Sequence, residues 1–190
     1  MKEIALHILD IAENSVAAGA KTVEITVEEN WPDNKIRVSI KDDGSGLDER
    51  KLAHIADPFV TSRTTRVAGL GIPFLKAAAE ECNGSLCVTS KPGEGTCLEV
   101  DFQRDHIDRM PLGDLASTVL TLVIGSPHIR WLFHYRVDGR AFVFDDEPIK
   151  RELGDIPLTD PLVLSFIRET LQDGVRHVQQ AANEAQPREM

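Results

Sequence analysis

Asp42-Asp43-Gly44-Ser45-Gly46 decides the fold, because it is one of four short motifs that follow one another in order. Asp10-Ile11-Ala12-Glu13-Asn14 precedes it, and Gly69-Leu70-Gly71 and Gly93-Glu94-Gly95-Thr96 follow it. Each motif alone is weak, since a lone Asp-Gly turn is common between a strand and a helix. In this order and spacing, the four motifs together describe one pocket built from a helix, a strand end and glycine loops.

The elements around these motifs alternate between helical and extended patterns. Ile4, Ile8 and Ile11 fall on one stripe of a helix, whereas hydrophobic residues alternate with polar ones along the extended segments. Helices are predicted at residues 3–18, 48–55 and 70–82, strands at 22–28, 35–41, 85–90 and 96–102, and a polar loop at 57–69. Beyond them we expect a helix at 113–124, a hairpin at 129–136 and 140–145, and a helix at 160–173.

These patterns predict an α+β fold in several parts. Residues 1–104 form the main domain, and residues 105–112 read as a polar linker. Residues 113–178 are predicted to form a small C-terminal α+β appendage that packs on the main domain or on a partner, because so short a segment buries too little surface alone. Residues 179–190 are polar and predicted to be disordered.

Composition excludes several classes of protein. The chain has 190 residues and a formal net charge of -10, and both halves are acidic, so no nucleic-acid partner is expected. No apolar run approaches the roughly 18 residues of a membrane span. No signal-peptide pattern opens the chain, and three cysteines form no CxxC pair, so we expect a cytoplasmic protein with reduced thiols.

Asp10 and Asn14 lie four residues apart on the first predicted helix and share a face. A carboxylate there can hold or deprotonate a water, and an amide oxygen can ligate Mg²⁺. A plain polar helix face explains the pair equally well when it is taken alone.

Asp42 ends a predicted strand just before two glycines, Gly44 and Gly46. A carboxylate accepts hydrogen bonds from an exocyclic amine such as that of adenine, and glycines allow the backbone to approach a planar base closely. This combination makes ATP the first hypothesis for the ligand.

Gly69-Leu70-Gly71 stands just before another predicted helix. Free backbone N–H groups at a helix N-terminus favour bound phosphate. Arg63 and Arg66 precede them in the loop and are candidates for pairing with the terminal phosphate.

With these motifs in place, the chain resembles the GHKL superfamily of ATP-binding domains, which includes gyrase, heat-shock chaperones, histidine kinases and MutL. The resemblance rests on five segments: residues 11–20 are similar to the N box of the MutL type, 42–46 to the G1 box, 57–63 to the F box of histidine kinases, 69–72 to their G2 box, and 83–96 to their closing strands. It covers about residues 1–104 and implies a two-layer α/β sandwich, with helices covering a mixed sheet and with ATP and Mg²⁺ as ligands.

The resemblance implies a role for each matched residue. Asn14 would ligate Mg²⁺, Asp42 would bind the adenine amine, and Thr96 would sit near the adenine. The base and the phosphates would be lined by Gly44, Gly46, Gly69, Leu70 and Gly71. Superfamily hydrolases carry Glu four residues before the Asn. Asp10 takes that place here and is shorter by about 1.5 Å, so the resemblance implies a weak general base and slow hydrolysis.

The resemblance also implies a partner. Histidine kinases carry a helical hairpin with a phosphoacceptor His before the ATP domain, whereas this chain starts at the N box, and His7 is predicted to be structural. Phosphate transfer would then act on a regulatory or substrate protein, as in stand-alone kinases of the anti-sigma type. A non-kinase ATP switch and a slow ATPase are the alternatives, and a homodimer stays open.

Overall fold

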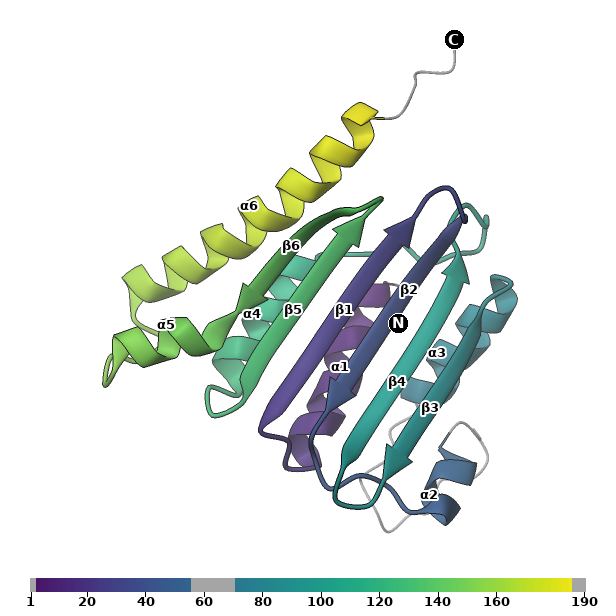
Figure 1. Cartoon of the computed structure of the whole chain (residues 1–190), viewed down its shortest axis with the longest axis horizontal. Coiled ribbons are helices and arrows are strands. Elements are labelled where there is room, and N and C mark those ends of the chain that lie inside the picture. Colours follow the sequence, from purple (N-terminus) through teal and green to yellow (C-terminus); the bar gives the residue numbers. More distant parts are fainter. Residues whose placement is uncertain (1–2, 56–70, 186–190) are drawn as a thin grey trace.

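A computed structural model of the chain describes residues 3–55 and 71–185. Six strands form one mixed sheet in the order β3-β4-β2-β1-β5-β6 (Figure 1). The strands are β1 (Thr22–Asn30), β2 (Lys35–Asp42), β3 (Ser85–Lys91), β4 (Gly95–Gln103), β5 (Arg130–Val137) and β6 (Arg140–Asp145). Neighbouring strands are antiparallel except β1 and β5, which are parallel. The predicted α+β class with a mixed sheet is confirmed.

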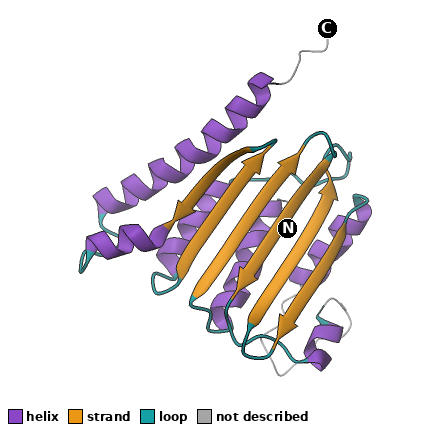
Figure 2. Ribbon diagram, in the orientation of Figure 1, coloured by secondary structure: helices purple, strands orange, loops and turns teal. Residues whose placement is uncertain are grey.

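Helices cover one face of this sheet, and others lie along its edges (Figure 2). They are α1 (Ile4–Ala17), α2 (Glu49–His54), α3 (Gly71–Glu81), α4 (Leu115–Gly125), α5 (Asp146–Leu153) and α6 (Pro161–Ala185). Helix α1 contacts both α3 and α4, and α6 packs on α4, β5 and β6. Within the described ranges, every helix is too short or too polar to cross a membrane.

The core lies between the sheet and this helix layer. Alternate residues of β1, such as Val23, Ile25 and Val27, are buried in the core that also contains the apolar side of α1, while the residues between them point to the other face. That other face is polar, with Arg37 and Lys41 exposed on β2. The period-two pattern of the sequence therefore predicts the sheet face correctly.

The predicted linker is tied to the first helix. The carbonyls of Pro111 and Leu112 accept hydrogen bonds from the backbone N–H groups of Ile4 and Ala5, at 3.0 and 2.9 Å. The first N–H groups of a helix have no partner within the helix, so this segment satisfies two of them.

The C-terminal segment is α+β, as expected, and its strands extend the sheet of the first segment. Strand β5 pairs with β1 from Thr22↔Arg130 to Glu29↔Val137. Trp131 and Phe133 of β5 belong to the same hydrophobic core as Ile25 of β1. Packing against the first segment is thus confirmed, while the domain boundaries themselves stay a prediction.

Two features of this segment differ from the sequence-based expectations. The residues 179–185, predicted to be disordered, continue α6 as a helix through Ala185. The predicted end near residue 173 was wrong because Gly174 does not stop the helix: a Cβ there would lie 2.2 Å from Phe142 Cε2, so this glycine lets β6 pack closely. Helix α5 was not predicted. It starts with a hydrogen bond from the Glu147 N–H to the Asp145 side chain, and Pro148 is tolerated within a first turn.

Candidate functional site

Asp42 lies at the end of β2, and its buried carboxylate is fixed by three donors. Oδ2 accepts a hydrogen bond from Ser15 Oγ at 2.7 Å. Oδ1 accepts from the Gly44 N–H at 2.9 Å and from the Thr96 N–H at 3.3 Å. A carboxylate has about four acceptor positions. The protein therefore fixes the orientation of Asp42 and leaves it one further hydrogen bond to accept.

The glycine turn after Asp42 is pinned to the elements on both sides. The Ser45 N–H donates to the Ala18 carbonyl at the end of α1, and the Gly93 N–H of the β3–β4 turn donates to the Ser45 carbonyl. Gly46 has a positive φ of 64°, and a Cβ on it would lie 2.1 Å from the Lys91 carbonyl oxygen. Only glycine fits there, because both the backbone conformation and the space exclude a side chain.

The next residue, Asp43, strengthens the same turn. Its Oδ1 accepts hydrogen bonds from the N–H groups of Lys21 and Thr22, at 2.7 and 2.9 Å. Burial alone would raise the pKa of Asp43, but these backbone hydrogen bonds hold it below its ordinary value. The turn that carries Gly44 is therefore tied to the start of β1 by a charged anchor.

A pocket of about 280 Å³ opens on the helix side of Asp42. Its walls are mostly apolar and come from α1, α3, three strands and the residue after α2: Ile11, Ile40, Ile55, Ile72, Val88 and Leu98. Asn14, Asp42, Gly46 and Thr96, all predicted as site residues, also line it. An apolar slot with one fixed carboxylate at its end is suited to a planar base that carries an amine.

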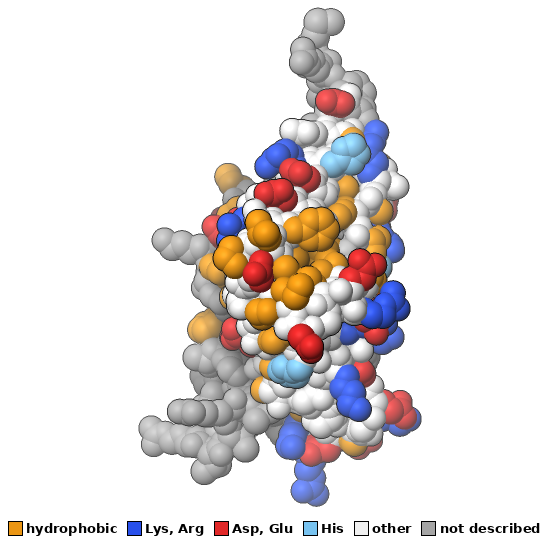
Figure 3. All heavy atoms as spheres, turned by 90° about the vertical axis from the view of Figure 1, so that its left-hand side faces the viewer, with side chains coloured by type: hydrophobic (Ala, Val, Ile, Leu, Met, Phe, Trp, Pro, Cys, Tyr) orange, Lys and Arg blue, Asp and Glu red, His pale blue; other side chains and the backbone are white. Residues whose placement is uncertain are grey.

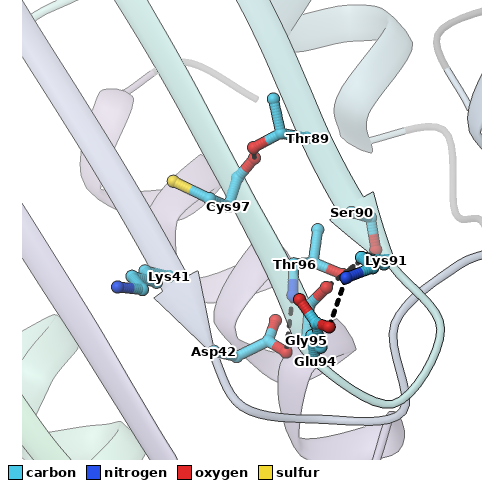
Figure 4. Close-up of a pocket in the computed structure, with 9 residues that line it drawn as sticks. All are labelled: Lys41, Asp42, Thr89, Ser90, Lys91, Glu94, Gly95, Thr96 and Cys97. Carbon is cyan, nitrogen blue, oxygen red and sulfur yellow. Dashed lines mark hydrogen bonds and ion pairs between the residues drawn. The ribbon is translucent and has the colours of Figure 1, made fainter.

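A second, more polar hollow of about 250 Å³ shares Asp42 and Thr96 with this pocket. Figure 4 shows it at the β3–β4 turn, where Lys91 and Glu94 form an ion pair beside Gly95. Lys41, an exposed residue of β2, lies at its border on the open face of the sheet. We place the nucleotide candidate on the helix side, because the apolar walls and Asn14 are there.

Asp10 and Asn14 lie one turn apart on α1, as predicted. Asn14 is half-buried and lines the pocket, whereas Asp10 points toward the start of α3. A Cβ on Gly71 would fall 1.6 Å from Asp10 Oδ2. Among the described residues, this buried oxygen has no hydrogen-bond partner. A buried acceptor of this kind fits a donor such as a water.

Some predicted site residues lie outside the described residues. These are Arg63, Arg66, Gly69, Leu70 and the whole segment 57–63 that resembles an F box. Of the glycine motif before α3, only Gly71 is described, and it is the first residue of that helix.

Sequence reasoning missed two residues of the pocket. Ser15 was not predicted as a site residue, but its hydroxyl is the donor to Asp42. Lys51 of α2 lines the pocket, and its Nζ lies 3.7 Å from Asp48 Oδ2. Asp48 also caps the helix, because its side chain accepts a hydrogen bond from the Lys51 backbone N–H. Ser15 directly follows Asn14 in the sequence, and this position is a hint that it lies near the site. No local pattern points to Lys51.

The remaining polar groups of this region limit what the site can hold. His7 is 2% exposed, and burial lowers its pKa, so it is a structural residue as predicted.

Within the described part of the chain, no three His, Cys, Asp or Glu side chains cluster as they would around a protein-bound metal ion. A single amide ligand such as Asn14 fits Mg²⁺ instead, because this ion is usually held partly by nucleotide phosphates.

The chain is similar to known ATPase and kinase sequences. The sequence profile of a family described as "Histidine kinase-, DNA gyrase B-, and HSP90-like ATPase" matches residues 2–106. Sporulation kinase A of Bacillus subtilis is 29% identical over 104 residues, which cover 55% of this chain and 16% of that kinase. Sensor protein kinase FleS of Pseudomonas aeruginosa is 36% identical over 90 residues, covering 47% of this chain and 22% of that kinase. The chain spans less than a quarter of either kinase.

The fold is also similar to that of a solved structure. The N-terminal domain of a DNA repair protein has a TM-score of 0.51 at 13% identity, covering 75% of this chain and 52% of that chain. At this identity the likeness concerns the fold alone. It extends over more of the chain than the sequence profile does.

Proposed function

The chain belongs to the family of histidine kinase-, DNA gyrase B- and HSP90-like ATPases, and we propose that it binds ATP in the pocket beside Asp42. The fixed Asp42 carboxylate in an apolar slot carries this proposal, because it has one acceptor position left for the adenine amine. Thr96 would sit beside the base, and the turn of Gly44 and Gly46 would lie close to it.

The phosphates would extend from this slot toward α3. Asn14 would help to hold Mg²⁺, which neutralises phosphate charge when it is bound. The first N–H groups of α3, starting at Gly71, would face the phosphates, since helix N-termini favour anions. Lys51 is the one described cation that lines the pocket, so we assign it a phosphate contact. Arg63, Arg66, Gly69 and Leu70 remain candidates for the same task.

We further propose that the phosphate is transferred to a partner protein. The support is the name of the two similar sequences, both of which are kinases. In-line transfer needs positioning and charge stabilisation more than covalent chemistry, and Asn14, Lys51 and the α3 N-terminus supply both. Asp10 would act as a weak general base that accepts a proton from the attacking group. A cytoplasmic location, where Mg-ATP is abundant, is part of this proposal.

A non-kinase switch and a slow ATPase are the alternatives. A switch would bind ATP and change its affinity for a partner without consuming the nucleotide. An ATPase would release phosphate to water at a rate that depends on Asp10. Incubation with γ-labelled ATP and proteins co-purified with the chain separates the three, because label appears on a partner, in free phosphate or in neither.

Thermal unfolding with and without Mg-ATP tests the binding step. At about 100 times the Kd, a ligand of the folded state stabilises it by about 2.7 kcal/mol, so the wild-type Tm should rise. Asp42→Ala should lose this rise, whereas Asp108→Ala, an exposed control between β4 and α4, should keep it. An unchanged rise in Asp42→Ala would show that the adenine binds elsewhere.

A further inference from the structure

Helix α5 and the first turns of α6 enclose an apolar groove that is separate from the nucleotide pocket. It has a volume of about 450 Å³, and Ile149 and Leu153 of α5 face Leu162 and Phe166 of α6 across it. Figure 3 shows hydrophobic side chains gathered on this side of the molecule. Contiguous apolar surface of this kind is a mark of binding sites.

Two apolar residues of this groove, Leu162 and Phe166, lie outside the surface through which α6 packs on the sheet. The helix packs through Ile167, Leu171 and Val175, which are buried on another stripe. Leu162 is 82% exposed and Phe166 is 58% exposed. Exposure of two large side chains one helical turn apart leaves room for a partner side chain between them.

The charge around the groove is acidic. Among the described residues that line it, Glu152 alone is charged, and Asp155 and Glu169 are exposed nearby along the chain. The basic groups close to α5 already have partners, since Lys150 pairs with Asp146 and Arg130 with Asp145. Arg151 and the exposed Arg168 lie off the groove sides of their helices, because the lining residues 148, 149, 152 and 153 of α5 and 162, 163 and 166 of α6 occupy one side of each helix.

We propose that this α5–α6 groove binds an amphipathic helix of a partner protein, with large apolar residues one turn apart and Lys or Arg beside them. A channel between two helices accepts the apolar ridge of a third helix, and the basic residues would pair with Glu152 and its acidic neighbours. A second copy of this chain fits less well, because a two-fold interface would bring the same acidic surface against itself.

Two synthetic peptides and a set of surface variants test this proposal in the full chain. One labelled amphipathic peptide contains only Leu and Lys, and its counterpart contains only Leu and Glu. Fluorescence anisotropy should show binding of the Leu–Lys peptide and at least about ten-fold weaker binding of the Leu–Glu peptide. The double variant Leu162→Ser, Phe166→Ser should weaken binding of the Leu–Lys peptide by about ten-fold or more, and Glu152→Gln should weaken it by a smaller factor.

The matched control is Ile107→Ser, because Ile107 is 94% exposed but lies between β4 and α4. It should bind the Leu–Lys peptide like the wild type. Equal binding by the double variant would overturn the proposal, since the peptide would then sit elsewhere on the acidic surface. Equal binding of both peptides would also overturn it. So would a dimer in sedimentation that the double variant abolishes, because a second copy would then be the occupant.

Discussion

The Asp10 carboxylate lies directly against Gly71, so closely that a Cβ on Gly71 would fall 1.6 Å from Oδ2 and 2.9 Å from Cγ. This contact joins the first motif, on α1, to the start of α3. It explains why the last residue of the Gly69-Leu70-Gly71 motif is a glycine: the space for its side chain is filled by a carboxylate from another helix. The distance between the Asp10 carboxylate and the start of α3, which we propose to face the phosphates, is thereby fixed.

Gly71→Ala should therefore displace Asp10 and shift the start of α3. We expect a smaller Tm rise with Mg-ATP and slower release of phosphate, both measured against the wild type. Gly125→Ala is the control, because a Cβ there meets no atom within 4 Å, and it should change neither quantity. Normal hydrolysis in Gly71→Ala would argue against a role for this contact.

Asp10→Asn should separate the proton-transfer role of Asp10 from binding. The amide keeps the shape of the side chain but is a poor base, so hydrolysis should slow by about a hundred-fold or more if Asp10 acts as a general base. The Tm rise with Mg-ATP should stay close to that of the wild type, because Asp10 does not line the proposed adenine pocket beside Asp42. Brisk hydrolysis in Asp10→Asn would assign the base to another group.

Ser15→Ala should weaken ATP binding less than the loss of Asp42 does. The hydroxyl donates to Asp42 Oδ2 at 2.7 Å, and hydrogen bonds to charged groups are worth about 1.5–3 kcal/mol. We expect an ATP Kd several-fold to about a hundred-fold higher by calorimetry, since the carboxylate persists but loses its orientation. Ser39→Ala, on β2 but half-buried and away from the pocket, should leave the Kd unchanged.

Much of the sheet could be predicted from the sequence because its signals are local. Alternation at Val23, Ile25 and Val27, and the turn residues between β1 and β2, fix a hairpin without knowledge of the rest of the chain. The pairing of β5 with β1 could not be predicted. It joins residues more than a hundred positions apart, such as Thr22 and Arg130, and no local pattern selects a parallel neighbour. The continuation of α6 past Gly174 was missed for a similar reason, because Phe142 occupies the space above that glycine.

The same difference between local signals and long-range packing holds for the candidate site. Asp42, Asn14 and Thr96 could be found by motif, and they line one pocket in the structure. Lys51 could not, since the helix predicted at residues 48–55 carries no signal that shows which of its side chains reaches the pocket. The α5–α6 groove was not visible in the sequence, because it depends on how two helices pack across residues 154–160.

Gly174→Ala should lower stability through the packing of α6 on β6. A Cβ at this position would lie 2.2–2.4 Å from three ring atoms of Phe142, so the helix or the ring must move. Overpacking of a core typically costs about 1–3 kcal/mol, and we expect a lower midpoint in urea denaturation. The double variant with Phe142→Leu removes the ring and should recover part of the loss, which a helix-propensity effect alone would not do. A midpoint at or above the wild-type value would contradict the close packing.

Asp43 should make the stability of the chain depend on pH under acidic conditions. The hydrogen bonds from Thr22 and Lys21 lower its folded-state pKa below the ordinary value of 3.8. A lowered pKa means that Asp43 stabilises the fold fully above that ordinary value, and that this stabilisation is lost as the pH falls through the folded-state pKa. Asp145, whose pKa is lowered by the hydrogen bond from Arg130, affects the stability in the same direction, so a comparison with Asp43→Asn is needed to isolate Asp43.

Urea midpoints of the wild type and Asp43→Asn, recorded at about pH 6 and about pH 3, should differ most at the higher pH and converge at the lower one. A gap that stays constant with pH would mean that the charge of Asp43 does not anchor the turn, and that the two N–H groups bind the neutral side chain equally well.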